Sequence, residues 1–229
     1  MMRVREGLGL IASSEGRGWL SFTLRKRLYS RVVSIGVRRD LDEYVAGDPA
    51  RDLDAVPPAK IPIEVRRLRP DDDLSFIADV PGLDPRLAQM RADQRWLLTG
   101  DLPAPWVAID SDGAVCFMSF LLRASDNAAI RARWGDLLPE LQPDEAAVEG
   151  PYAGDNMRGL GMMKDVLRQV LLAERDDGVR YVLGFIGDAN AASLAVAEYG
   201  GFDPYLKREE RWFLFRRRIR FLPYEDATT

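Results

Sequence analysis

The chain has 229 residues, of which 47% are hydrophobic and 30% charged, enough for one sizeable core with an appendage in a soluble protein. It has no histidine and a single cysteine, Cys116, so imidazole chemistry, an internal disulfide and a cysteine metal cage are excluded. No apolar run approaches the roughly 20 residues of a membrane helix. We therefore expect a cytoplasmic protein with no membrane span and no metal, whose chemistry uses carboxylates, hydroxyls, backbone or solvent.

The net charge of −4 conceals an asymmetry along the chain. Residues 1–39 carry nine Lys and Arg against two Glu, a balance of +7, so the remainder is −11. A basic arm of this kind either docks on the acidic body or meets an anionic partner, and both interpretations stay open. We expect no nucleic-acid binding, because the acidic body would repel a polyanion.

The first 59 residues are predicted to form an extension and a linker. Gly18 to Tyr29 is a short amphipathic segment, and Tyr29 to Val37 alternates in the manner of a β-strand. We expect this strand to lie at an edge, where it pairs with the domain's own sheet or with a second subunit. Residues 42–58 are acidic and proline-containing, which is typical of a linker. The main domain is expected to cover residues 60–229.

Within the main domain, hydrophobic periodicity and turn residues predict alternating strands and helices. The predicted strands are 61–68, 106–110, 114–122, 144–152, 180–187 and one or two within 208–221; the predicted helices are 74–79, 86–98, 126–142, 162–174 and 191–199. The strands at 106–110 and 114–122 should form an antiparallel hairpin. Those at 144–152 and 180–187 are joined through a helix, so they should be parallel.

A glycine-bearing turn, Arg158-Gly-Leu-Gly161, leads directly into the predicted helix 162–174. Met163, Val166, Leu167, Val170 and Leu171 have the spacing of one buried helical face, so the helix begins at the glycines. A helix N-terminus has unpaired N–H groups and partial positive charge, and glycine lets a phosphate approach that backbone. The turn therefore predicts a pyrophosphate site.

Several motifs together resemble the GCN5-related N-acetyltransferase (GNAT) superfamily, over about Ile61 to Phe221. The first motif is the glycine turn with Arg158 and Gly161, followed by the interval of 12 residues from Gly178 to Asn190. The others are the helix start Asn190-Ala-Ala-Ser193 and the helix end Glu198-Tyr-Gly-Gly-Phe202. The family motif ends in a small residue where this chain has Met163.

The resemblance implies an α/β (α+β) fold, with a mixed, mostly antiparallel sheet, a central splayed parallel strand pair and flanking helices. It also implies acetyl-CoA, or another acyl-CoA, as co-substrate, with its pyrophosphate on the turn and its pantetheine along the first of the splayed strands. Gly150-Pro151 is the expected point of parting, an ordinary bulge being the alternative. The implied cofactor-binding residues are Tyr152, Ala153, Arg158, Gly159, Leu160, Gly161, Met162, Met163, Asn190 and Ser193.

The family's reaction is the attack of an amine on a thioester, which needs a proton acceptor and a group that stabilises or protonates the thiolate. Glu145 and Glu149 lie on one face of the strand entering the splay. We favour Glu149 as the base because it is nearer the parting, and Glu145 stays the alternative. Tyr199 is the weaker candidate for the acid. Cys116 is expected to be plain core.

The leading hypothesis is an acyl-CoA-dependent N-acyltransferase that acts on a primary amine of a small molecule or peptide. Two alternatives stay open. An acidic acyl carrier protein is the donor in one, with the basic arm receiving it. In the other, the protein binds CoA or a partner without turnover.

Overall fold

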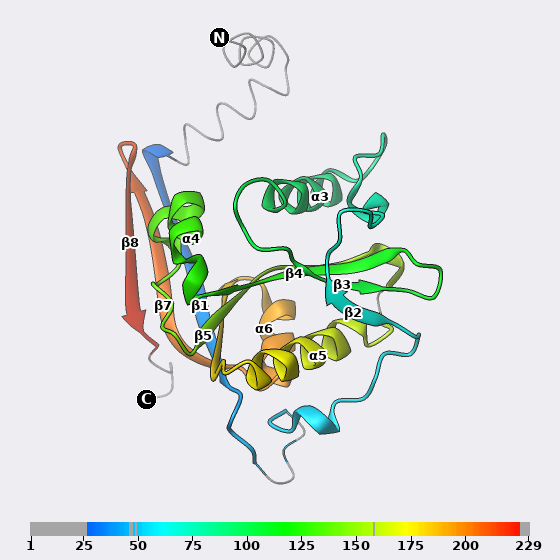
Figure 1. The fold of residues 1–229 in the computed structure, drawn as a ribbon. Helices are drawn as coiled ribbons and strands as arrows, with labels where there is room; N and C mark the ends of the chain where they lie inside the picture. The colour runs from blue at the N-terminus through cyan, green and yellow to red at the C-terminus, as the bar shows by residue number, and fades with distance from the viewer. Residues whose placement is uncertain (1–26, 46–47, 49, 158, 225–229) are drawn as a thin grey trace. The chain divides into compact units, whose positions relative to one another are not determined.

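The computed structural model describes residues 27–45, 48, 50–157 and 159–224 (Figure 1). The predicted amphipathic segment lies, up to residue 26, outside these residues. The strands are β1 Tyr29–Asp40, β2 Glu64–Arg67, β3 Trp106–Ile109, β4 Val115–Arg123, β5 Glu145–Ala153, β6 Tyr181–Gly187, β7 Asp203–Phe213 and β8 Arg216–Pro223. The helices are α3 Pro85–Leu97, α4 Asn127–Trp134, α5 Met162–Asp176 and α6 Ala191–Tyr199, with short 3-10 turns that include η1 Leu53–Ala55, η2 Ser75–Ile77 and η4 Gly135–Leu137.

In hydrogen-bonding order the strands run β2-β3-β4-β5-β6-β1-β7-β8. The pairs β2–β3, β3–β4, β4–β5 and β7–β8 are antiparallel, and β5 and β6 are parallel. The predicted mixed, mostly antiparallel sheet with one parallel pair is thereby confirmed. The prediction that Tyr29 to Val37 forms an edge strand is wrong, because β1 has β6 on one side and β7 on the other. Alternation shows that a segment is a strand but not which strands flank it.

The described residues divide into two compact units, which we describe separately. The hairpin unit comprises residues 27–36, 185–190 and 204–224, and the helix unit comprises the described parts of 37–184 and 191–203. Strands β1 and β6, and β7 through Asp203, contribute residues to both units. The predicted boundary near residue 60 stays a prediction.

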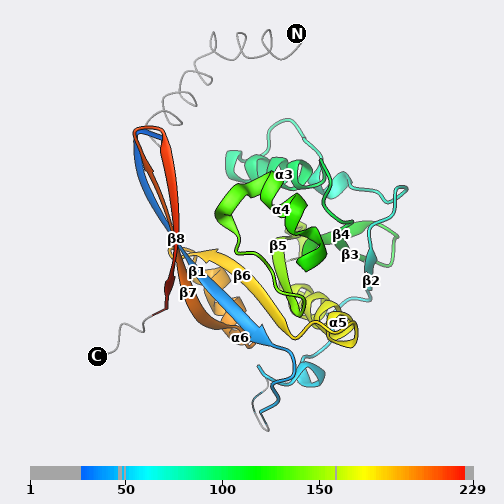
Figure 2. The same cartoon turned by 60° about the vertical axis from the view of Figure 1, so that its left-hand side comes forward.

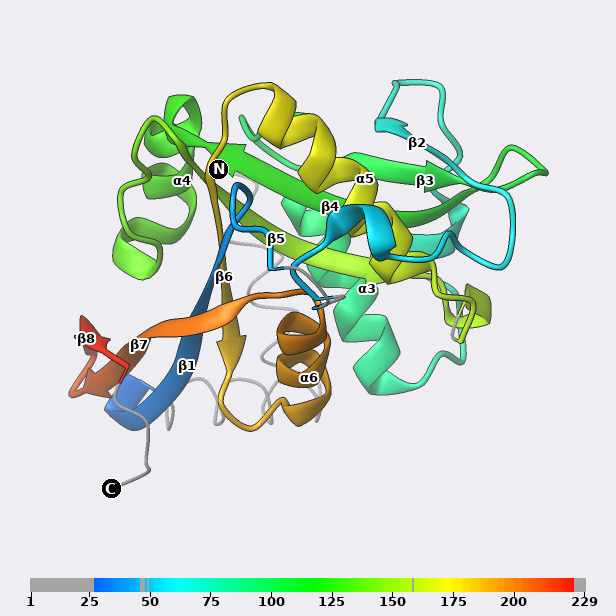
Figure 3. The ribbon, with the colours of Figure 1, turned by 90° about the horizontal axis from the view of Figure 1, so that it is seen from below.

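In the helix unit, α3 and α5 cover opposite faces of β3, β4 and β5, as Figures 1 and 3 show. Strand β4 is buried over almost its whole length, which explains its continuous apolar run. Asp84 caps α3 by accepting from the N–H groups of Arg86 and Leu87, and Pro85 occupies the first turn. The core of this unit includes Ile77, Val107, Phe117, Met118, Phe120, Leu122, Val166, Val182 and Leu183.

Two predicted elements are shorter than expected, and a third is broken. Only Glu64–Arg67 of the strand predicted at 61–68 is paired, and only the 3-10 turn Ser75–Ile77 forms where a helix was predicted at 74–79. The helix predicted at 126–142 stops at Trp134, where Gly135 has φ 65°. A glycine in this left-handed region ends a helix readily.

In the hairpin unit, β7 and β8 form a long antiparallel ribbon (Figure 2). Arg208 lies over the ring of Phe185 at 4.6 Å, and that ring lies 5.9 Å from the ring of Phe221. Gly36 lies close to the same cluster, because a Cβ there would meet Leu206 at 2.8 Å. These contacts join residues 27–36 and residues 185–190 to the strands of the β7–β8 hairpin.

A buried carboxylate holds the C-terminal half of α5 against the sheet of the helix unit. Glu174 is 1% exposed and accepts from Arg67 at 3.1 Å, from Arg123 Nε at 2.7 Å and from Trp106 Nε1 at 3.2 Å. The three donors come from β2, β4 and β3. One side chain therefore fixes the helix to three strands.

No helix among the described residues is long and apolar enough to cross a bilayer.

Replacing Glu174 with Gln should lower the free energy of unfolding by about 3 kcal/mol, because two guanidinium groups lose the charge they are buried against. Urea unfolding followed by circular dichroism measures the change. The matched control is Asp177→Asn: Asp177 pairs with Arg123 at 2.9 Å but is 69% exposed, so its loss should cost less than about 1 kcal/mol. Equal effects of the two variants would contradict the account.

Candidate active site

Helix α5 begins where the glycine turn predicts, with Gly161 as its N-cap at φ 75°. Gly159 has φ 77°, and a Cβ there would meet nothing within 4 Å. Both positions lie in the left-handed region that favours glycine. The N-cap residue Gly161 has no side chain, so, among the residues that the structure describes, no N-cap side chain accepts from the first N–H groups of α5, those of Met162, Met163 and Lys164. The end of α5 is thus suited to an anion.

Ala59 and Lys60 hold the glycine turn in place. The N–H of Lys60 donates to the carbonyl of Leu160 at 2.9 Å, and its ammonium donates to the carbonyl of Gly159 at 3.0 Å. The N–H of Ala59 donates to the carboxylate of Asp165, a buried residue of the first helical turn, at 2.9 Å. These contacts place a cation beside the helix start. Sequence reasoning missed Lys60, because a lone lysine after two prolines carries no pattern.

A second cation lies in the first turn of α5. The ammonium of Lys164 lies 3.2 Å from the centroid of the Tyr199 ring, at the end of α6. Tyr199 is 46% exposed. The structure therefore brings this candidate acid to the helix start, beside the predicted pyrophosphate site.

The buried face of α5 contains Val166, Val170 and Leu171, as predicted, but Met163 and Leu167 are only half-buried. Met162, rather than Met163, is buried, at 1% exposed, and its sulfur lies 3.4 Å from that of Cys116. Met162 can therefore meet a ligand only through its backbone. The face also contains Asp165 and Glu174, two carboxylates that apolar periodicity disregards but whose polar partners permit burial.

The parallel pairing of β5 with β6 ends early. Its register joins Glu145, Ala146 and Ala147 to Tyr181, Val182 and Leu183, while β5 runs on to Ala153. Gly150-Pro151, the predicted point of parting, lies three residues later. There β5 has one more residue than β4 between the pairs Phe120–Glu149 and Met118–Tyr152, so Gly150-Pro151 forms a bulge against β4. The parting of β5 from β6 lies three residues earlier, after Ala147.

The two candidate bases lie in different surroundings on β5. Glu145 begins the strand, and its carboxylate accepts the N–H of Gln142 at 2.9 Å, which closes the preceding turn. Glu149 is half-buried and directly precedes the bulge. At about 3.3 Å per residue, the two lie roughly 13 Å apart along the strand. The contact with Gln142 gives Glu145 a structural role.

Two buried oxygens lie beside the bulge without a hydrogen-bond partner among the described residues. They are Oε1 of Gln94, on α3, and the hydroxyl of Tyr152. The carboxamide of Gln94 lies 3.5 Å from where a Cβ of Gly150 would stand, and the ring of Tyr152 lies 5.8 Å from that of Phe76. A buried polar group without a partner costs about 1 to 3 kcal/mol, so each calls for an explanation. Sequence reasoning missed Gln94, because polar residues on a helix usually face solvent.

The remaining predicted cofactor residues are spread over the chain. Ala153 ends β5 opposite Phe117, and half-buried Ser193 is in the first turn of α6. Asn190 directly precedes α6 but belongs to the hairpin unit, whereas the glycine turn belongs to the helix unit. Arg158 lies outside the described residues.

A shallow hollow of about 190 Å³ lies over α4 and η4. Its lining residues are Asn127, Ala128, Ile130, Arg131, Gly135, Leu138, Pro139 and Glu140. None of the predicted site residues lines it. We assign it no role in catalysis.

No family model matches the sequence, and no curated protein matches it. Among solved structures, the chain is similar to the GCN5-related glucosamine N-acetyltransferase region of a fungal multi-domain GH3 β-N-acetylglucosaminidase, with a TM-score of 0.51 and 16% identity over 87% of this chain and 23% of that one. A GCN5-related N-acetyltransferase from Sphaerobacter thermophilus gives a TM-score of 0.44 and 16% identity over 95% and 60% of the two chains. A tandem GNAT protein from the clavulanic acid biosynthesis pathway gives 0.48 and 16% over 94% and 61%.

The chain thus spans less than a quarter of the first of these chains and about 60% of the other two. At such identities the likeness concerns the fold alone. These three neighbours are described as GCN5-related N-acetyltransferases or as a GNAT protein, and the fold of this chain is GNAT-like.

Cys116 should not react with a thiol reagent in the folded protein. Burial raises the pKa of its thiol to about 11, so thiolate is scarce at pH 8, and the sulfur is covered. Ellman's reagent should therefore titrate one thiol per chain only after guanidinium is added. Rapid reaction of the native protein would show that this part of the core is open.

Proposed function

We propose that the protein is an acyl-CoA-dependent N-acyltransferase, with acetyl-CoA as the first donor to test. The observation that carries the proposal is the start of α5, where two left-handed glycines, uncapped amides and the ammonium of Lys60 meet in a GNAT-like fold. Helix N-termini with glycine turns bind phosphates through backbone N–H groups and the helix dipole. The pyrophosphate of CoA is an anion of this kind.

In this proposal the pyrophosphate accepts from the N–H groups of Met162 to Lys164, and Lys60 offsets part of its charge. The pantetheine arm lies along β5 after Ala147, where the parallel register has ended. Its two amides are hydrogen-bonding groups that a strand backbone can match. The thioester then lies toward Glu149.

The reaction is an attack of the free amine on the thioester carbonyl carbon. The new C–N bond forms as the C–S bond breaks, the amine loses a proton and the thiolate of CoA departs. We assign Glu149 as the acceptor of that proton, directly or through water. The ring of Tyr199 lies beside Lys164 at the start of α5, which is the pyrophosphate end of the cofactor in this arrangement, so the thiolate takes its proton from water. Glu145 has no catalytic role in this proposal, and its carboxylate accepts the N–H of Gln142.

The acceptor amine belongs, in this proposal, to a molecule with polar groups beside the amine. Gln94 Oε1 and the Tyr152 hydroxyl are buried next to the bulge that follows Glu149, and neither has a partner among the described residues. An acceptor hydroxyl or amide that reached either oxygen would give it a hydrogen-bond partner. This geometry favours a small polar amine over an aliphatic one.

Gly161→Asp should abolish most CoA binding, because a carboxylate would stand where the pyrophosphate is received. Gly161→Asn is the matched control: both residues tolerate a left-handed φ, and a Cβ at Gly161 meets only Ala59, at 4.0 Å. Calorimetry should show the Asp variant at least about 30-fold weaker than the Asn variant, near 2 kcal/mol. Equal affinities of the two folded variants would remove the anion site from this turn.

Glu149→Gln should lower kcat/KM at pH 7 by about 100-fold or more, the usual worth of a general base. The loss should shrink at high pH, where more of the amine is already deprotonated. Release of CoA measured across pH 6 to 10 tests this. Glu145→Gln is the control and should change the rate less than about twofold. A loss that is the same at every pH would give Glu149 a structural role instead.

A further inference from the structure

The turn of the β7–β8 hairpin has an unusual sequence for its geometry. Phe213 pairs with Arg216, so Leu214 and Phe215 form a two-residue turn, with φ 46° and 64°. A tight hairpin with both central residues at positive φ normally uses Asn-Gly, because side chains in this region are strained. Two bulky residues here cost about 1 kcal/mol or more each. Such a cost points to a function for their side chains.

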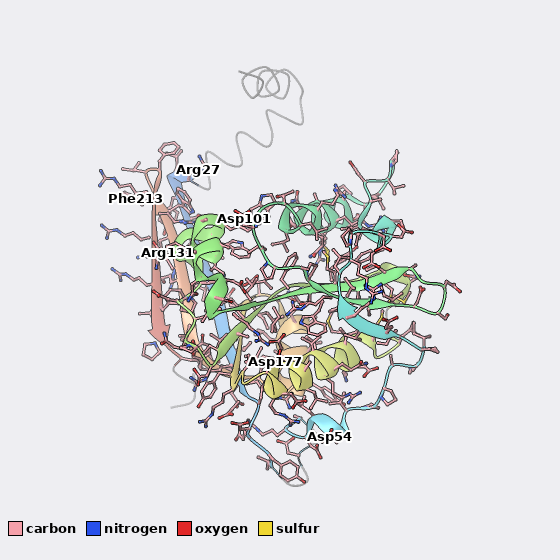
Figure 4. All side chains as sticks on the ribbon, in the orientation of Figure 1. Arg27, Asp54, Asp101, Arg131, Asp177 and Phe213 are labelled. Carbon is pink, nitrogen blue, oxygen red and sulfur yellow. The ribbon has the colours of Figure 1, made fainter. Side chains whose placement is uncertain are left out.

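These side chains are exposed and gathered at one end of the hairpin unit. Phe213, Leu214 and Phe215 are 63%, 60% and 53% exposed. The N–H of Leu214 donates to the carbonyl of Leu28 at 3.0 Å, which brings Leu28 and Tyr29, 44% and 69% exposed, to the same end. We call these five residues the hairpin tip; Figure 4 labels Phe213, with Arg27 nearby. Exposed apolar groups gathered in this way mark an interaction site.

One face of the hairpin behind the tip is strongly basic. Because side chains alternate along a strand, this face carries Lys207, Glu209, Arg211, Phe213, Arg216, Arg218, Arg220 and Leu222. Arg211 lies directly opposite Arg218, a repulsive pair.

Glu209 is the one carboxylate among those eight residues, and it is already engaged. It is 7% exposed and lies 2.6 Å from Arg31 Nε and 3.7 Å from Arg211. Over the whole hairpin unit, nine Lys and Arg face three Asp and Glu, a balance of +6. The basic face is therefore suited to an anionic partner.

We propose that the hairpin unit docks on the surface of an anionic lipid bilayer, with the tip entering the interface and the basic face binding phosphate headgroups. Leucine and phenylalanine gain free energy by burial among acyl chains, and tyrosine suits the headgroup boundary. Each arginine near such a surface contributes about 1 kcal/mol, which is about fivefold in partitioning. The proposal is independent of the acyltransferase assignment, since it uses residues of the hairpin unit alone.

A nucleic acid is the competing anionic partner, and the geometry disfavours it. Single strands are bound by aromatic rings spread along a basic groove, where successive bases stack. Here Phe213 and Phe215 are at the turn with Leu214 between them, and a leucine offers no ring to a base. A bilayer buries all three.

The test is co-sedimentation of the full chain with vesicles of phosphatidylcholine, alone or with about 30% phosphatidylglycerol. The tip variant is Leu214→Asn with Phe215→Gly, which gives the turn the residues that its φ angles prefer, so the hairpin should fold at least as well. The original chain should bind the anionic vesicles in low salt and the tip variant should lose at least about tenfold in partitioning. Binding that is equal for both vesicle types, or undiminished in the tip variant, overturns the proposal.

A second pair of variants isolates the charge. Arg216→Ser with Arg218→Ser removes two cations from the basic face, and Arg86→Ser with Arg131→Ser removes two exposed arginines from the helix unit. The first should weaken partitioning up to about 30-fold and the second by about twofold or less. Equal effects of the two pairs would contradict the proposal. So would tighter binding to single-stranded DNA than to vesicles in the same salt, or a tip-dependent dimer in size-exclusion chromatography.

Discussion

The buried carboxylate of Glu174 is the interaction on which the helix unit most depends. It binds donors from β2, β3 and β4 near the C-terminal end of α5, while Asp165 binds the Ala59 N–H near the other end. A helix held at both ends has a fixed starting point. The amides of its first turn are then positioned before any ligand arrives, and this preorganisation is what a phosphate site requires.

Strong local signals in the sequence were sufficient to predict most elements. Helix α6 was predicted at its observed bounds and α5 at its observed start, because glycine and apolar periodicity agree there. The pairing order was not predictable: β1 is flanked by two strands that lie far along the chain. The helix predicted at 74–79 failed because six residues suffice for only a single 3-10 turn in this context.

The candidate site was predictable where it depends on backbone and not where it depends on tertiary contacts. The glycine turn is visible in the sequence, since its geometry requires glycine itself. Lys60 and Gln94 were not, because each is placed by packing against residues distant in sequence: Lys60 lies against the glycine turn and Gln94 against Gly150. The end of the parallel register at Ala147, before the bulge at Gly150, likewise depends on two neighbouring strands at once.

The central claim is that the start of α5 binds the pyrophosphate of CoA, and the amide spectrum of the ¹⁵N-labelled protein tests it most directly. On addition of CoA, the account predicts that the largest shifts fall on Gly159 to Lys164, with smaller ones along β5. Pantetheine, the part of CoA that lacks the pyrophosphate, should leave the amide chemical shifts of the turn nearly unchanged. Shifts from CoA that fall elsewhere in the chain, with the turn unaffected, would contradict the account.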